Sequence, residues 1–194
     1  GSFAVADPMN QGLAYGWKIW SAPLLSGSVL MGCAVFSFPG RDYVLVGLML
    51  FLPLLDRGWR PPAIPKRSAD LMVMASLAVA ATALLAWRPQ AMPYALSTLL
   101  LAALPEEWFF RAYFMPRLGS GWGANVVASL LFSLLHGLAR SWETALLVLG
   151  PSLFYGWLYQ RTRNLPLLVL THALSNLVFA LFFAPFVQRW ISIF

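Results

Sequence analysis

The sequence predicts an all-α integral membrane protein, a polytopic bundle of about seven transmembrane helices with room for an eighth. Two observations support this fold class. First, 60% of the 194 residues are hydrophobic and only 10% are charged, whereas soluble domains carry about 25% charged residues. Second, long apolar runs recur along the chain beside nine Trp and fourteen Phe residues, which is typical of helices whose solvent is lipid.

The apolar runs define the expected helices in chain order. They cover residues 20–38, 43–56, 69–87, 93–115, 123–138, 143–160 and 166–184. A straight span needs about 20 residues, so the second, fifth and sixth runs are short, and we expect them to tilt or to take residues from their loops. The tail 186–194 is expected to lie at the membrane interface or to complete an eighth helix.

Turn residues separate these runs. Pro39-Gly40-Arg41-Asp42 is typical of a turn after the first run. The widest loop, 57–67, has three prolines and four cations, which makes it a poor helix. Without an internal repeat or a soluble segment, we expect residues 1–194 to form one membrane domain.

The net charge of +6 comes from cations in the short loops. No Lys/Arg-rich arm or nucleic-acid motif accompanies them, so nucleic acid is not an expected partner. One face of the bundle would hold eight cations and the other four, and the positive-inside rule places the richer face in the cytoplasm. The richer set is Lys18, Arg57, Arg60, Lys66, Arg67, Arg117, Arg161 and Arg163. We therefore expect a cell-membrane protein with a cytoplasmic N-terminus.

A small set of polar residues falls inside the apolar runs, where each ionisable group costs about 2.5–3.5 kcal/mol on insertion scales. Such groups persist mainly when they are paired or functional. Counted at 1.5 Å per residue from the expected cytoplasmic loops, three separate helices place them at depths of roughly 10–20 Å. The set is Glu106, Glu107, Arg111, His136, His172 and Asn176. We expect them to form one layer towards the cytoplasmic side.

The fourth run carries two adjacent carboxylates with different expected roles. Glu107 and Arg111 are four residues apart, so they share a helix face and can pair. Glu106 is rotated by about 100° from Glu107 and is free to point elsewhere. Pro105 removes a backbone hydrogen bond, and we expect a local break there that admits water to the site.

These residue types suit peptide hydrolysis, which needs an activated nucleophile, a proton acceptor and donors aimed at the oxyanion. No serine or cysteine is compelling as a nucleophile. Cys33, the only cysteine, lies far from the set and is expected to pack as a small apolar residue. Direct attack by water is therefore favoured over an acyl-enzyme. The structural alternative is that the charged pair and the histidines only hold helices together.

Three motifs carry a family resemblance. Residues 106–111 fit EExxxR, residues 132–136 fit FxxxH, and residues 172–176 fit HxxxN. Together, in this order and on apolar runs, they resemble the CAAX-protease and bacteriocin-processing family, also called the Abi family, of glutamic-type intramembrane endopeptidases. The resemblance covers about residues 93–180, which would be the catalytic core helices.

The resemblance implies a role for each matching residue. Glu106 would be the general base for a water that His136 helps to bind and polarise. His172 and Asn176 would stabilise the oxyanion. Glu107 and Arg111 would pair and shape the site or position substrate, and Phe132 would be a packing residue of its motif. No metal or other cofactor is implied. The substrate would be a protein with a hydrophobic or lipid-modified segment, cleaved during maturation or sorting.

Three other functions remain open from the residues alone. Glu106, His136 and His172 are legitimate zinc ligands, although no HExxH motif is present. The same cavity could bind peptides without cleaving them, as in a scaffold or immunity protein. A proton-coupled transporter also uses intramembrane Glu and His, but its usual internal repeats are absent from the sequence. The oligomeric state is left open.

Overall fold

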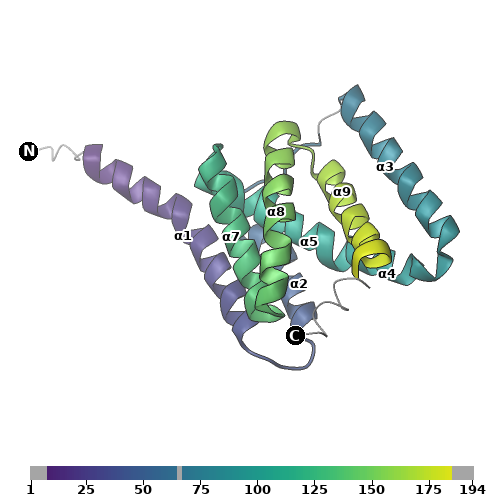
Figure 1. The fold of residues 1–194 in the computed structure, drawn as a ribbon. Coiled ribbons are helices and arrows are strands. Elements are labelled where there is room, and N and C mark those ends of the chain that lie inside the picture. The colour runs from purple at the N-terminus through teal and green to yellow at the C-terminus, as the bar shows by residue number, and fades with distance from the viewer. Residues whose placement is uncertain (1–7, 65–66, 185–194) are drawn as a thin grey trace, which may run out of the picture.

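The computed structural model describes the backbone of residues 8–64 and 67–184, and the side chains from residue 22 onward. Within these residues the regular structure is entirely helical (Figure 1). The helices are α1 (Pro8–Val35), α2 (Arg41–Leu55), α3 (Ser68–Trp87), α4 (Met92–Thr98), α5 (Leu104–Glu107), α6 (Met115–Leu118), α7 (Trp122–Ala139), α8 (Trp142–Thr162) and α9 (Leu165–Val178). This confirms the predicted fold class.

Each of the seven predicted runs corresponds to one helical segment of the described chain. The fourth run corresponds to α4, α5 and α6, which follow one another with only π-helical turns between them. The largest difference is in α1, which begins at Pro8, twelve residues before the predicted start at residue 20. α8 reaches Thr162 and has 21 residues, so the sixth run is not short. The predicted tail 186–194 lies outside the described residues.

The α4–α6 segment corrects the prediction of a break at Pro105. The chain stays helical through this residue, which occupies the first turn of α5. The backbone instead widens on either side, in π-helical turns at Leu99–Ala103 and Trp108–Phe114. A π-turn accommodates one extra residue and is frequent at functional sites. The proline is therefore absorbed by a change of helical register.

Two sets of contacts define the two faces of the bundle. At one face, the Asp56 carboxylate pairs with Arg117 at 2.8 Å, and Gln160 donates to the Gly121 carbonyl at 2.9 Å. At the other face, Arg41 donates to the carbonyl of Ala139. We call the first the cation-rich face, because the loops around 57–64, 117–121 and 161–164 lie there. The second, with the turns at 36–40, 88–91 and 140–141, we call the opposite face.

The turn between α1 and α2 is formed as predicted. Gly40 has a φ of 80°, in the left-handed region that glycine adopts without a steric cost. α2 starts directly after it at Arg41. The described part of the predicted 57–67 loop has no regular element, which agrees with its proline content.

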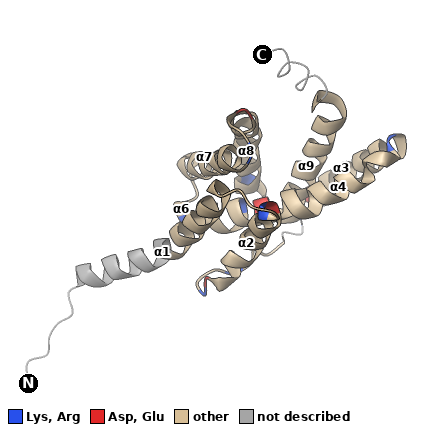
Figure 2. Cartoon of the chain, turned by 90° about the horizontal axis from the view of Figure 1, so that it is seen from below, with Lys and Arg blue, Asp and Glu red and all other residues tan. Residues whose placement is uncertain are grey.

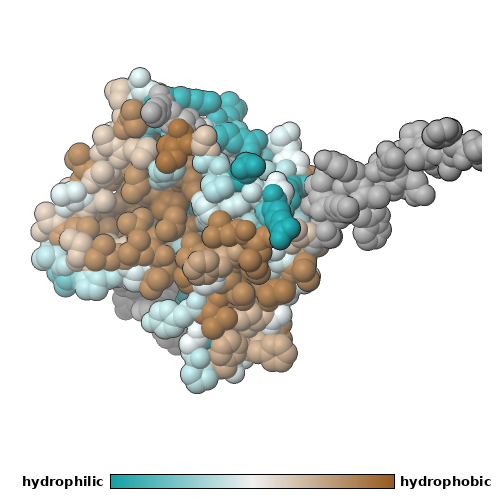
Figure 3. All heavy atoms as spheres, turned by 180° about the vertical axis from the view of Figure 1, so that it is seen from behind, coloured by the Kyte–Doolittle hydropathy of each residue, from teal (hydrophilic) through white to brown (hydrophobic). Residues whose placement is uncertain are grey.

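Many large apolar side chains of the described residues are exposed on the surface, as a lipid environment requires. Figure 3 shows brown, hydrophobic residues over most of one face, and Figure 2 shows few charged residues along the ribbon. Among the described helices, three are long and apolar enough, by length and composition, to cross a membrane: Ser68–Trp87, Trp122–Ala139 and Leu165–Phe183. α2 has 15 residues, so it is short, as predicted.

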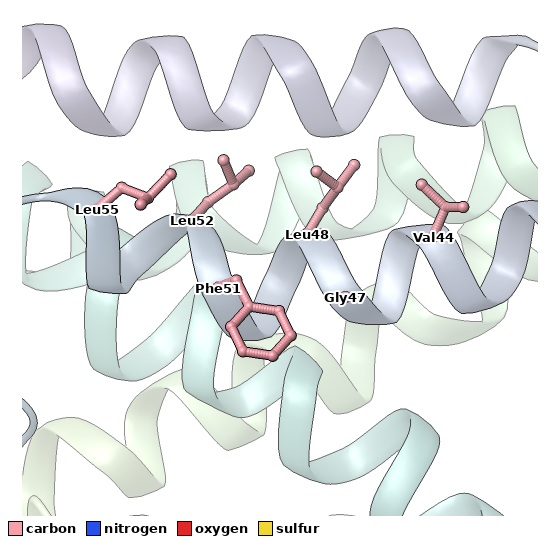
Figure 4. Close-up of a pocket in the computed structure, with 6 residues that line it drawn as sticks. All are labelled: Val44, Gly47, Leu48, Phe51, Leu52 and Leu55. Atoms are coloured by element: carbon pink, nitrogen blue, oxygen red, sulfur yellow. The ribbon is translucent and has the colours of Figure 1, made fainter.

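An apolar groove of about 360 Å³ follows one side of α2 (Figure 4). It is lined by Val44, Gly47, Leu48, Phe51, Leu52 and Leu55. These side chains contain no group that can ionise or exchange a proton. The chemistry of this protein must therefore lie elsewhere.

The helices α7 and α8 pack closely against each other. Gly156 lies against Asn125, and a Cβ on this glycine would come within 1.7 Å of the Asn125 Oδ1. Asn125 in turn donates to the Leu153 carbonyl at 2.9 Å and accepts from Ser129 at 3.2 Å. This close contact between small and polar residues is typical of helix pairs in membranes. It fixes the α8 turn that carries Ser152.

Candidate active site

Glu106 lies at the centre of the predicted polar layer. Its Oε1 is 3.7 Å from Nε2 of His136 on α7, and its Oε2 is 3.7 Å from Nε2 of His172 on α9. The Glu106 side chain is 13% exposed, so it is enclosed but not sealed. Three helical segments therefore bring the two histidines to the two oxygens of one carboxylate. The sequence predicted that these groups share one layer, but not this arrangement around Glu106.

The orientation of His136 is fixed by its own helix. Its Nδ1 lies 3.0 Å from the carbonyl oxygen of Phe132, one turn earlier. A carbonyl only accepts, so Nδ1 carries the hydrogen, and in the neutral ring Nε2 has a free lone pair. The Phe132 ring packs against the imidazole with a centroid distance of 4.4 Å. In this neutral form, His136 presents a proton acceptor towards Glu106.

His172 is held by the second carboxylate. Its Nδ1 is 2.7 Å from Oε1 of Glu107, a short, charge-assisted distance. Tyr155 of α8 stacks on the ring with a centroid distance of 4.7 Å and an interplanar angle of 23°. The sequence predicted a pair between Glu107 and Arg111 alone, so this contact was not expected. Glu107 therefore sets the direction in which His172 points.

The predicted Glu107–Arg111 pair is present and completely buried. Nε of Arg111 lies 3.7 Å from Oε2 of Glu107, and both side chains are 0% exposed. Arg111 also donates through Nη2 to the Ser152 hydroxyl at 2.7 Å and to the Ser152 carbonyl at 3.0 Å. Its guanidinium carbon lies 5.3 Å from the Phe132 ring centroid, within cation–π range. These contacts hold α5, α7 and α8 together around the buried Arg111 guanidinium.

Asn176 lies one helical turn after His172 on α9. Its Nδ2 donates to the hydroxyl of Thr98 on α4 at 2.9 Å. Thr98 is itself buried. A carboxamide nitrogen has two hydrogens, so this bond orients the group and leaves one donor for another partner.

Sequence reasoning missed three residues of this arrangement: Thr98, Ser152 and Tyr155. Ser152 and Tyr155 lie on α8, where none of the three motifs falls. Their only signal is that they are polar groups within an apolar run, and Ser and Tyr are common enough in membrane helices for that signal to be weak. Their role depends on the rotation of α8 against α7, which hydrophobicity alone does not define.

A cavity of about 70 Å³ reaches Glu106 and His136. Its other lining residues come from α2, from the π-helical turn before α5 and from the end of α7. They are Asp42, Leu45, Val46, Met49, Leu101, Ala102, Leu135, Ala139 and Arg140. The carboxylate and the imidazole are therefore open to a small molecule such as water.

In the described part of the chain, no group of three or more His, Cys, Asp or Glu side chains meets the geometry of a metal site. The donor atoms of the site can accept or transfer protons without a metal.

These features define a class: a multi-helix membrane protein that encloses a carboxylate–histidine centre among its helices. Residues 87–178 match the family model of the type II CAAX prenyl endopeptidase Rce1-like proteins. The matched segment contains every predicted site residue, and the match supports the CAAX protease family for this chain. No curated protein and no solved structure matches the chain.

Proposed function

We propose that this protein is an intramembrane endopeptidase that hydrolyses a peptide bond with a water activated by Glu106 and His136. The observation that carries the proposal is the placement of the two Glu106 oxygens, each 3.7 Å from Nε2 of a different histidine. The match to a family of membrane proteases supplies the reaction class. The roles of the individual residues rest on the geometry.

The space beside Glu106 and His136 suits one water molecule. Two acceptors 3.7 Å apart can both receive a hydrogen bond of about 2.9 Å from one oxygen that lies off the line joining them. A water there donates one hydrogen to Glu106 Oε1 and the other to His136 Nε2. Its lone pairs then point away from both, towards a bound carbonyl carbon. The cavity next to these two side chains provides the room.

The reaction then proceeds in two balanced steps. The water oxygen forms a bond to the carbonyl carbon while Glu106 takes one water proton, and the carbonyl electrons move onto oxygen as an oxyanion. The tetrahedral intermediate collapses, the carbon–nitrogen bond breaks, and Glu106 gives its proton to the departing amine. The products are a carboxylic acid and an amine, and Glu106 is again ionised. A general base of this kind contributes about 10²–10⁴-fold to a rate.

His172 and Asn176 are suited to stabilise the oxyanion. The site holds two carboxylates and one guanidinium, so a proton on His172 balances the charge and makes Nε2 a donor. Asn176 has one amide hydrogen left after its bond to Thr98. Donors held in place before the reaction need no reorganisation when charge develops. Glu107 and Arg111 act through these groups, as positioning residues.

The substrate we propose is a protein with a hydrophobic or lipid-modified segment near the scissile bond, processed in maturation or sorting. The apolar surface of the bundle favours a substrate that approaches within the bilayer. The N-terminus is proposed to be cytoplasmic, because the cation-rich face carries the larger number of Lys and Arg residues.

The test is cleavage of C-terminal membrane peptides by purified protein in nanodiscs. Wild type is compared with Glu106→Gln, which keeps the size of the side chain but cannot take a proton. Glu143→Gln is the matched control, because Glu143 is an exposed carboxylate in the first turn of α8. We expect cleavage by wild type and by the control, and a loss of at least about 10²-fold in Glu106→Gln.

A zinc chelator separates the metal alternative from the proposed one. Cleavage that persists in chelator supports water activated by Glu106 and His136. Cleavage that disappears in chelator and returns with zinc contradicts it and favours a zinc protease. Peptide binding without cleavage in wild type and in both variants favours a peptide-binding protein.

A further inference from the structure

The cavity at Glu106 and His136 extends from these two side chains towards the face opposite the cation-rich loops. Asp42 and Arg140 line its outer part. Their side chains are 60% and 62% exposed and lie 4.0 Å apart. Such exposed charges are costly in lipid, so they belong at the water boundary. The cavity thus leads from the two catalytic groups to the opposite face.

The position of His136 along α7 agrees with this direction. His136 is three residues from the end of α7 at Ala139, which is about 4.5 Å at 1.5 Å per residue. It is fourteen residues from the start of α7 at Trp122, which is about 21 Å on the same scale. The short side of the helix ends at the opposite face, where Arg41 donates to the Ala139 carbonyl.

The route to the cation-rich face is filled with side chains. The six residues that follow Trp108 are all buried, with at most 5% of each exposed. They are Phe109, Phe110, Arg111, Ala112, Tyr113 and Phe114. Trp59 covers this turn from outside: its indole donates to the Ala112 carbonyl at 3.2 Å, and its ring meets Trp108 edge to face at 4.9 Å.

An ion pair completes this closure. Asp56 at the end of α2 and Arg117 on α6 lie 2.8 Å apart, with side chains only 10% and 15% exposed. The pair holds α2 against α6 at the cation-rich face. Water from that face would have to cross the packed aromatic turn to reach Glu106.

We infer that the active site opens on the face opposite the cation-rich loops, which the positive-inside rule makes the extracytoplasmic face. The substrates are then proteins whose scissile bond has already crossed the membrane or lies in the outer leaflet. The statement about substrates rests on the proposed function, whereas the direction in which the cavity opens does not. It differs from the expectation, based on residue counting, of a site towards the cytoplasm. The residues were counted only from the expected cytoplasmic loops, and not from the far end of α7, which lies three residues beyond His136.

The experiment is cysteine labelling in a Cys33→Ala background, with single cysteines introduced by Ala102→Cys or Ala139→Cys in the cavity lining. Ser120→Cys marks the cation-rich face, since Ser120 is exposed in the turn before α7. Ala80→Cys, on the exposed lipid side of α3, reports any reagent that enters the bilayer. A charged, membrane-impermeant methanethiosulfonate is applied to sealed right-side-out and inverted vesicles, and labelling is read by mass shift.

We expect both cavity cysteines to label in right-side-out vesicles at a rate at least tenfold above Ala80→Cys, and Ser120→Cys to label only in inverted vesicles. Labelling of the cavity cysteines from the same side as Ser120→Cys, or from neither side, overturns the inference. Labelling of Ser120→Cys from outside overturns the assignment of the face. Two cavity variants are used so that misfolding of one does not remove the test. Labelling needs no catalysis, so it succeeds or fails independently of the cleavage assay.

Discussion

The helices α7 and α3 are both long and apolar, yet they play opposite parts in this molecule. In the apolar window of α7, 39% of the residues are buried, against 6% for α3. α7 contributes His136 and Phe132 to the site and packs along α8, whereas the buried residue of α3 is Asp70. Hydropathy measures suitability for lipid, and it makes both helices candidate membrane spans. What distinguishes the functional helix is polar and small residues on one side.

The largest effect on stability is expected from breaking the buried Glu107–Arg111 ion pair beside the site. Arg111→Met removes the cation of a buried ion pair and leaves the Glu107 carboxylate, at 0% exposure, with His172 as its remaining partner, which costs about 3–5 kcal/mol. Arg161→Met, on an exposed part of α8, is the control and should change stability by less than about 0.5 kcal/mol. Thermal unfolding in detergent, followed by tryptophan fluorescence, measures both. Equal stability of the two variants would contradict a structural role for the buried pair.

A smaller effect is expected at the α7–α8 contact. Gly156→Ala puts a methyl group into Asn125, and overpacking of this kind costs about 1–3 kcal/mol. Gly150→Ala lies on the same helix with nothing within 4 Å of its added carbon, and should be neutral or stabilising by about 0.5–1 kcal/mol. Denaturant or thermal unfolding gives the sign of each change. A stabilised Gly156→Ala variant would mean that the two helices are not in close contact.

The attachment of α3 is expected to matter less. Asn164 donates to Asp70 Oδ2 at 3.2 Å and also caps α9 through the backbone of Leu167. Asp70→Ala should cost about 1 kcal/mol, with peptide cleavage within about twofold of wild type. Asp70→Asn keeps an acceptor and should lie between the two in unfolding temperature. A loss of cleavage as large as that of Glu106→Gln would contradict this expectation and make α3 part of the active site.

The smallest effect is expected on the lipid side of α3. Val79 is 69% exposed, so Val79→Ala creates no cavity and should change stability by less than about 0.5 kcal/mol. The measurement is the same unfolding transition. A cost above about 1 kcal/mol would show that this face packs against something other than lipid.

The sequence was sufficient to predict the helices and the polar layer. Apolar length and turn residues predicted all seven helical segments of the described chain, because a bilayer imposes one length scale on all of them. The four-residue spacing of Glu107 and Arg111 predicted their pairing, which is confirmed at 3.7 Å. The separate direction of Glu106 followed from its rotation about the helix axis and is also confirmed.

The contacts between helices could not be predicted in the same way. His172 bonds to Glu107, Asn176 bonds to Thr98 and Arg111 bonds to Ser152. Each depends on how one helix is rotated and displaced against another. The π-helical turns on both sides of α5 add a change of register that a period of 3.6 residues does not contain. Roles for individual residues stay predictions for this reason.

The division of labour between the adjacent carboxylates is the central claim, and one paired measurement tests it most directly. Cleavage rate and unfolding temperature are determined for Glu106→Gln and Glu107→Gln in the same preparation. Glu106→Gln should lose cleavage by at least about 10²-fold with an unfolding temperature close to wild type, whereas Glu107→Gln should lower both, because it disturbs Arg111 and His172 together. Cleavage retained in a well-folded Glu106→Gln variant would contradict the account.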